Sequence, residues 1–206
     1  MQLATFFALA FFVPLTFAGD HGLPAKCLKE YSSIVSHYGN RKGHCARLQM
    51  ILNCFKPTEK TAGASGKTLD AMRYLFYQEG VFVSKLGECK GMETESLKEV
   101  VKKSDLAKRL KANGFVGLDS VETSEDDRCA LDVHRACIDK YLRRVMSNHD
   151  VCMDADDWAK CYHDEKAREN CNAKILEDFT AMLDGEVGQT VINGVMEIMG
   201  RSCVSE

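Results

Sequence analysis

"KCLKEYSSIV" at residues 26–35 and "ACIDKYLRRV" at residues 136–145 decide the fold of this 206-residue chain, because the second stretch matches the first. The two stretches share a cysteine, a tyrosine (Tyr31 and Tyr141) and a valine at equivalent positions. The cysteines that follow continue the match, with 17, 8 and 34 intervening residues in the first half and 14, 8 and 41 in the second. The pattern predicts an internal duplication.

Each half is predicted to contain three helices. In the first half, apolar residues recur at intervals of three and four, which favours helices over about 27–38, 44–55 and 67–86. "GNRKG" at 39–43 separates the first two, because its two glycines interrupt the helical pattern.

The second half follows the same order, with "SNHD" at 147–150 as the turn between its first two helices. A long third helix is expected after it. Its apolar stripe consists of Ile175, Phe179, Met182, Val187, Val191, Val195 and Met199. Gly185, Gly188 and Gly194 are expected to bend this helix. The predicted fold class is all-α, with two tandem disulfide-clamped three-helix units.

The ten cysteines predict five disulfides, since an even count is typical of secreted proteins. Cys45 and Cys54 are nine residues apart on one predicted helix, roughly 13 Å, which is too far for a disulfide. In an antiparallel hairpin, facing residues are equally distant from the turn, so Cys27 faces Cys54. In the second half, Cys129 and Cys171 are also equally distant from the turn, and they lie further from it than Cys137 and Cys161 do. The predicted pairs are Cys27–Cys54, Cys45–Cys89, Cys129–Cys171, Cys137–Cys161 and Cys152–Cys203.

The first eighteen residues are uncharged and almost entirely apolar, and they end in Thr-Phe-Ala. This pattern is typical of a signal peptide, so residues 1–18 are expected to be removed and the protein to be secreted. No later apolar segment reaches eighteen residues, so no stable membrane span is expected. The predicted divisions are a first cysteine-rich unit at 19–89, a linker at 90–128 and a second unit at 129–206.

The linker is predicted to contain one amphipathic helix. "SLKE" at 96–99 resembles a capping box, and Asn113-Gly114 is a typical helix end. The apolar stripe between them consists of Leu97, Val100, Val101, Leu106 and Leu110. Lysines and arginines on the other face suggest a membrane-surface helix, but acidic residues are interspersed. A solvated connecting helix is the preferred interpretation.

The composition argues against several classes of function. The net charge of −3 is spread along the chain, which predicts no nucleic-acid partner. No CxxC pair is present, so neither a structural zinc site nor a thioredoxin-type redox site is expected. We expect no metal and no cofactor.

Three short motifs resemble functional sites but are interpreted as structural. "CYHDEKARENC" at 161–171 contains His163 next to Asp164, but it lacks the flanking cysteines and calcium loop of a secreted phospholipase. Neighbouring residues on a helix also point about 100° apart. "GASGKT" at 63–68 lacks the first glycine of a phosphate-binding loop. "DADDWAKCYHDE" at 154–165 lacks the turn glycine of a calcium loop. No catalytic residues are predicted.

Three functions remain. The leading hypothesis is a non-enzymatic extracellular binding protein whose partner is another protein or a receptor. The second is an extracellular carrier of apolar small molecules, with a pocket lined by Met72, Phe76, Phe82, Phe179, Met182, Met196 and Met199. The third, and least favoured, is a lipase-like hydrolase at His163.

The disulfide-clamped hairpin of the second half resembles secreted cysteine-rich all-helical domains of invertebrates and plant-type helical hairpins. The resemblance is one of hairpin topology and implies no particular function.

Overall fold

The computed structural model describes residues 22–38, 43–58, 66–148 and 151–199. Within these ranges the regular structure is helical throughout, and the predicted all-α class is confirmed. The α-helices are α1 (Gly22–Tyr38), α2 (His44–Phe55), α3 (Lys67–Lys85), α4 (Glu95–Lys103), α5 (Asp105–Ala112), α6 (Arg128–Asn148), α7 (Val151–Arg168), α8 (Lys174–Asp184) and α9 (Glu186–Met199). Two short 3-10 helices, η2 (Leu118–Ser120) and η3 (Glu125–Asp127), lie between α5 and α6.

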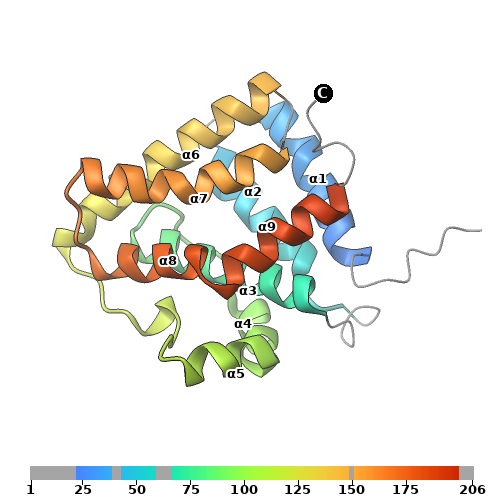
Figure 1. The fold of residues 1–206 in the computed structure, drawn as a ribbon, viewed down its shortest axis with the longest axis horizontal. Coiled ribbons are helices and arrows are strands. Elements are labelled where there is room, and N and C mark those ends of the chain that lie inside the picture. Colours follow the sequence, from blue (N-terminus) through green and yellow to red (C-terminus); the bar gives the residue numbers. More distant parts are fainter. Residues whose placement is uncertain (1–21, 39–42, 59–65, 149–150, 200–206) are drawn as a thin grey trace, which may run out of the picture.

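Helices α1 and α2 pack against each other, as do α6 and α7 (Figure 1). Each of these two hairpins carries a disulfide clamp. The Cα atoms of Cys27 and Cys54 are 5.6 Å apart, and those of Cys137 and Cys161 are also 5.6 Å apart. Such distances are typical of disulfides. The disulfides of the described residues are Cys27–Cys54, Cys45–Cys89, Cys129–Cys171 and Cys137–Cys161. All four pairs were predicted from the sequence; the fifth, Cys152–Cys203, lies outside the described side chains.

The two halves of the chain share one hydrophobic core. Helix α3 packs against α9, and α1 packs against α6, so each contact joins one half to the other. A main cluster of buried residues draws members from α2, α3, α6, α7, α8 and α9, and a smaller one joins Val35 to Ile138 and Leu142. The units predicted at 19–89 and 129–206 are therefore not separated by solvent.

A glycine allows the close packing of α3 against α9. A Cβ atom at Gly194 would lie 2.3 Å from the Cγ2 atom of Thr68, far inside van der Waals contact. Gly194 is thus required for a close approach and does not bend the helix as the sequence predicted. The bend is at Gly185, whose extended backbone separates α8 from α9. The prediction of a single long third helix in the second half is therefore wrong.

The linker also contains two helices where one was predicted. Ser104 adopts an extended backbone between α4 and α5, and its side-chain oxygen accepts a hydrogen bond of 3.1 Å from the Ala107 amide. This is the geometry of an N-cap, which explains why α5 begins anew at Asp105. Leu97, Val101 and Leu106 are buried, and both helices pack against α3. Among the described helices, none is long and apolar enough to cross a membrane.

Candidate ligand-binding pocket

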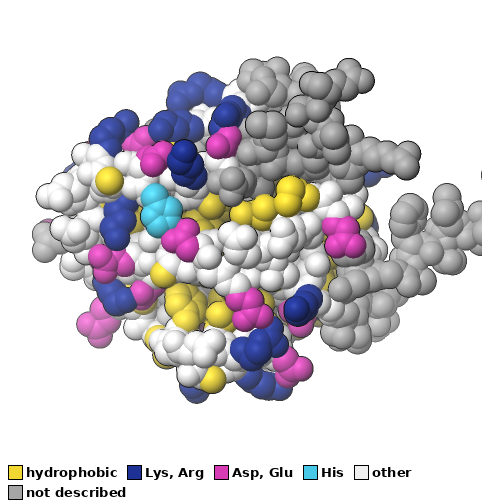
Figure 2. Space-filling model, viewed as in Figure 1, with side chains coloured by type: hydrophobic (Ala, Val, Ile, Leu, Met, Phe, Trp, Pro, Cys, Tyr) yellow, Lys and Arg dark blue, Asp and Glu magenta, His cyan; other side chains and the backbone are white. Residues whose placement is uncertain are grey.

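An apolar pocket lies where the two halves meet. Its inner cavity has a volume of about 100 Å³, within about 750 Å³ of empty space that includes open solvent at the mouth. The lining residues are Leu28, Tyr31, Leu75, Phe76, Glu79, Ile138, Tyr141, Trp158, Ala159, Leu183, Gly188, Val191, Ile192 and Val195. They come from α1, α3, α6, α7, α8 and α9, so both halves are needed to form the pocket. Figure 2 shows hydrophobic side chains along the line between α7 and α9.

Among the residues that line the pocket, Glu79 is the only acidic or basic one, and its side chain is buried, with 5% exposure. It occupies a position in the apolar stripe of α3, four residues after Leu75 and three before Phe82, so helical geometry turns it toward the core. Burial raises the pKa of the Glu79 carboxyl from 4.5 to about 8. In the described part of the chain, no cationic side chain forms an ion pair with Glu79.

Besides Phe76, three aromatic side chains that carry a polar group line the pocket. Tyr31 and Tyr141 occupy equivalent positions in the two halves, and their hydroxyl groups form a hydrogen bond with each other. The Arg47 guanidinium also reaches the Tyr31 hydroxyl. The ring of Trp158 lies 6.5 Å from that of Tyr141, centroid to centroid. Burial is the main reason that the pKa of Tyr31 rises to about 12, so this phenol stays neutral at ordinary pH.

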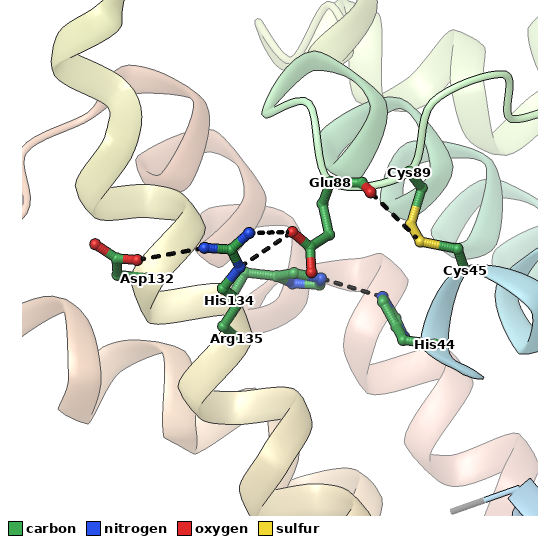
Figure 3. Close-up of polar contacts among 7 residues, drawn as sticks. All are labelled: His44, Cys45, Glu88, Cys89, Asp132, His134 and Arg135. Atoms are coloured by element: carbon green, nitrogen blue, oxygen red, sulfur yellow. Dashed lines mark hydrogen bonds and ion pairs between the residues drawn. A yellow bond between two sulfur atoms is a disulfide. The ribbon is translucent and has the colours of Figure 1, made fainter. Parts of the chain in front are cut away.

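A second buried polar cluster, the histidine contact, also joins the halves. His44, at the start of α2, and His134, on α6, point toward each other with their Nε2 atoms 3.2 Å apart (Figure 3). The Nδ1 atom of His134 lies 2.7 Å from the Tyr162 hydroxyl. Both imidazoles are almost fully buried. Burial lowers the pKa of His44 to about 4 and that of His134 well below 6.5, so the pair is neutral at pH 7.

An ion pair borders the histidine contact. Arg135 donates two hydrogen bonds, of 3.0 and 2.6 Å, to one carboxylate oxygen of Glu88. Asp132 lies 3.9 Å from the same guanidinium (Figure 3). Glu88 precedes Cys89, which is bonded to Cys45 next to His44. The disulfide therefore places the segment after α3 beside the start of α2, and Arg135 of α6 reaches that segment at Glu88.

The residues predicted to line an apolar pocket are mostly elsewhere. Of the seven, only Phe76 lines the cavity. Met72, Phe82 and Phe179 are fully buried in the core, where the last two stack with ring centroids 4.4 Å apart. Met182 is buried beside a different surface hollow, near Phe115. Met196 is 46% exposed, and the side chain of Met199 lies outside the described residues.

His163 pairs with a carboxylate, but not with its neighbour Asp164. Its Nε2 atom lies 2.7 to 2.8 Å from the carboxylate oxygens of Asp184 at the end of α8, and both side chains are about half exposed. In the described residues, no three His, Cys, Asp or Glu side chains are arranged to hold a metal ion. The segment around "GASGKT" falls largely outside the described residues, as do the side chains of Asp154 and Asp156.

Two signals in the sequence pointed to the pocket and were missed. One is the carboxyl of Glu79 within an otherwise apolar helical stripe. The other is the match between Tyr31 and Tyr141 in the two similar stretches of sequence, 26–35 and 136–145. The sequence around Trp158 gave no comparable signal, since "DADDWAKCYHDE" at 154–165 fits the acidic start of a helix equally well.

The chain matches no protein-family model, no curated protein and no solved structure at a significant level. The pocket is therefore interpreted from its own geometry and chemistry.

Proposed function

We propose that this protein binds a small apolar molecule in the pocket between its two halves, as an extracellular carrier or scavenger. The observation that carries the proposal is the cavity of about 100 Å³ with an almost wholly hydrophobic lining. A dry apolar cavity of ~150 Å³ is large enough to bind benzene. The cavity here is smaller than that and open at its mouth, so the part of the ligand that enters it would be no larger than one ring or a short alkyl chain.

The burial of Glu79 supports a functional interpretation of the pocket. Placing a carboxyl in an apolar environment without a cationic partner destabilises a protein. A leucine at this position would continue the stripe of α3 without that penalty. A buried titratable group with a shifted pKa in a concave apolar site is typical of a functional site.

Secretion is the second part of the proposal. It is supported by the predicted signal peptide at residues 1–18 and by disulfides, which persist in oxidising compartments. Disulfide clamps on both hairpins would hold the walls of the pocket in place outside the cell.

We also propose that the two halves arose by tandem duplication, with α1, α2 and α3 equivalent to α6, α7 and the α8–α9 pair. The equivalent disulfides Cys27–Cys54 and Cys137–Cys161 support it. So does the meeting of Tyr31 with Tyr141. Under this proposal, the pocket formed when two copies of one helical unit packed against each other.

A protein or receptor as partner remains a prediction. Among the described residues, only Val116 and Met196 are large apolar side chains with high exposure. Protein-binding surfaces often carry a contiguous apolar patch. The geometry therefore favours the small-molecule function.

The test uses Trp158, because it is the only tryptophan in the chain and lines the pocket. The probe is 2-phenylethanol, a neutral one-ring molecule, added at roughly millimolar concentration to the disulfide-bonded protein. We expect a saturable shift of the Trp158 indole signal in a two-dimensional ¹H–¹⁵N NMR spectrum.

Two variants on α7 provide a matched comparison. Ala159→Leu fills the cavity and should abolish the shift, whereas Ala167→Leu makes the same change at an exposed position of the same helix and should leave it unchanged. The absence of a shift in the wild-type protein, or equal shifts in the two variants, would overturn the proposed function.

A further inference from the structure

The charged side chain in the pocket indicates which charge a ligand should carry, whereas the shape of the pocket limits only its size. Of the fourteen lining residues, Glu79 alone has a charged side chain, and none of the others is Lys, Arg or His. The site therefore offers one negative charge at most, and no positive charge. This inference rests on the proposed function, because it concerns the occupant of the same cavity.

A carboxylate in this position lacks compensation from the protein. Glu79 is 95% buried, at 5% exposure, and in the described part of the chain no cationic side chain pairs with it. Buried charges in proteins are paired with an opposite charge. The missing partner could be supplied by a ligand, whose own charge would be desolvated and neutralised at the same time.

The aromatic walls favour the same sign of charge. Tyr31, Tyr141 and Trp158 all line the cavity, and the last two have ring centroids 6.5 Å apart. The face of an aromatic ring attracts a cation, most strongly when both are shielded from water. Three rings beside one carboxylate form a site suited to an organic ammonium group and poorly suited to an anion.

We propose that the pocket binds a small apolar amine, with its ammonium group paired to Glu79 and its hydrocarbon body among the apolar and aromatic walls. An apolar carboxylic acid, by contrast, would place a second negative charge beside Glu79 and would be disfavoured. The cavity volume limits the part that enters to about one ring or a short chain.

The test compares three one-ring probes of similar size and different charge: 2-phenylethylamine, 2-phenylethanol and phenylacetate. Dissociation constants are measured from the Trp158 indole signal at pH 8.5, where the Glu79 carboxyl is mostly charged and the amine is still protonated. We expect the amine to bind at least about tenfold more tightly than the alcohol, and phenylacetate to bind most weakly.

Variants assign the preference to one side chain. Glu79→Gln removes the charge with little change of shape, and it should abolish the preference for the amine while the alcohol still binds. Glu197→Gln is the control, because it removes one negative charge from an exposed position of α9. It should leave the ranking of the probes unchanged.

The dependence on pH adds a further readout. Glu79 faces Tyr31, which is bonded to Tyr141 and Arg47, and Tyr162, which is bonded to His134 beside His44. Burial raises the pKa of both tyrosines and lowers the pKa of both histidines. Glu79 is thus the group in this set that titrates between pH 6.5 and 8.5. Amine affinity should rise on the order of tenfold over that range in the wild type and stay flat in Glu79→Gln.

The outcomes separate the two proposals. If the alcohol binds and the amine binds no more tightly, or if Glu79→Gln keeps the preference, the amine assignment is overturned and the pocket function stands. If none of the three probes binds, both are overturned.

Discussion

Two buried polar clusters join the halves of this molecule, and they differ in whether described side chains of the protein pair within them. In the histidine contact, His44 and His134 face each other, and His134 also contacts the Tyr162 hydroxyl. In the pocket, the Glu79 carboxyl faces apolar and aromatic walls, without a cationic partner among the described residues. In the first cluster the polar side chains pair with one another, whereas no described cationic side chain pairs with the Glu79 carboxyl.

The contrast separates structure from function. A satisfied buried polar group specifies how two elements pack, whereas an uncompensated one destabilises the fold and suggests a role in binding. The two clusters also respond to pH in opposite directions, because burial disfavours a charged carboxylate and a charged imidazole alike. The dependence of stability on pH therefore distinguishes the two clusters.

The largest effect is expected at Glu79. Because its folded-state pKa is raised to about 8, its contribution to stability is intact below about pH 4.5 and is lost as the pH rises through 8. Glu79→Gln should thus unfold with a free energy about 4 kcal/mol higher than the wild type at pH 8, and nearly equal to it at pH 4. Urea denaturation at both pH values, with disulfides intact, measures this. Equal wild-type and variant stabilities at pH 8 would show that the carboxyl is compensated.

A smaller effect of opposite sign is expected from the histidine contact. The folded-state pKa of His44 is lowered to about 4, so its contribution is complete above pH 6.5 and is lost as the pH falls toward 4. His44 alone should lower the unfolding free energy by about 2 kcal/mol between pH 7 and pH 5. Urea denaturation at pH 7 and pH 5 is carried out on Glu79→Gln. In the wild type, Glu79 would increase the unfolding free energy as the pH falls and so mask the loss due to His44.

Replacing the histidine supplies the control for that measurement. In the same background, His44→Gln should reduce the decline between pH 7 and pH 5, because His134 would be the remaining buried imidazole. A decline as steep as that of the parent would mean that the acid sensitivity originates elsewhere in the molecule.

The smallest effect concerns the hydrogen bond that completes the histidine contact. Tyr162→Phe removes the hydroxyl 2.7 Å from the His134 Nδ1 atom and should lower the unfolding free energy by about 1 to 2 kcal/mol at pH 7. His163→Ala should change it by less than about 0.5 kcal/mol, since the His163–Asp184 pair is half exposed. If both variants had equal stabilities, the histidine contact would be energetically no different from a surface pair.

The parts of the fold that could be predicted depend on local geometry. The disulfides of the described residues follow from helix spacing and the position of two turns, both of which are visible in the sequence. The breaks at Ser104 and Gly185 were not predicted, because the apolar stripe continues across each of them. At Ser104 the serine side chain caps a new helix, and at Gly185 the backbone becomes extended.

The pocket could not be predicted from the apolar pattern, because its position depends on the packing of two halves that lie far apart in the sequence. Phe82 and Phe179 carry the same apolar signal as Phe76, yet they stack on each other in the core and only Phe76 reaches the cavity. Hydrophobicity shows which face of a helix is buried, but not where packing leaves space. Glu79 was the better indicator, since a carboxyl on a buried face requires a specific explanation.

The most direct measurement is a ¹³C NMR titration of the Glu79 carboxyl carbon, assigned by comparison with Glu79→Gln, with and without saturating 2-phenylethylamine. We expect Glu79 to titrate near pH 8 in the free protein and the amine to shift its pKa downward, because an ammonium group stabilises the carboxylate. A pKa near 4.5 in the free protein, unchanged by the amine, would contradict the claim that Glu79 is an uncompensated ligand-binding group.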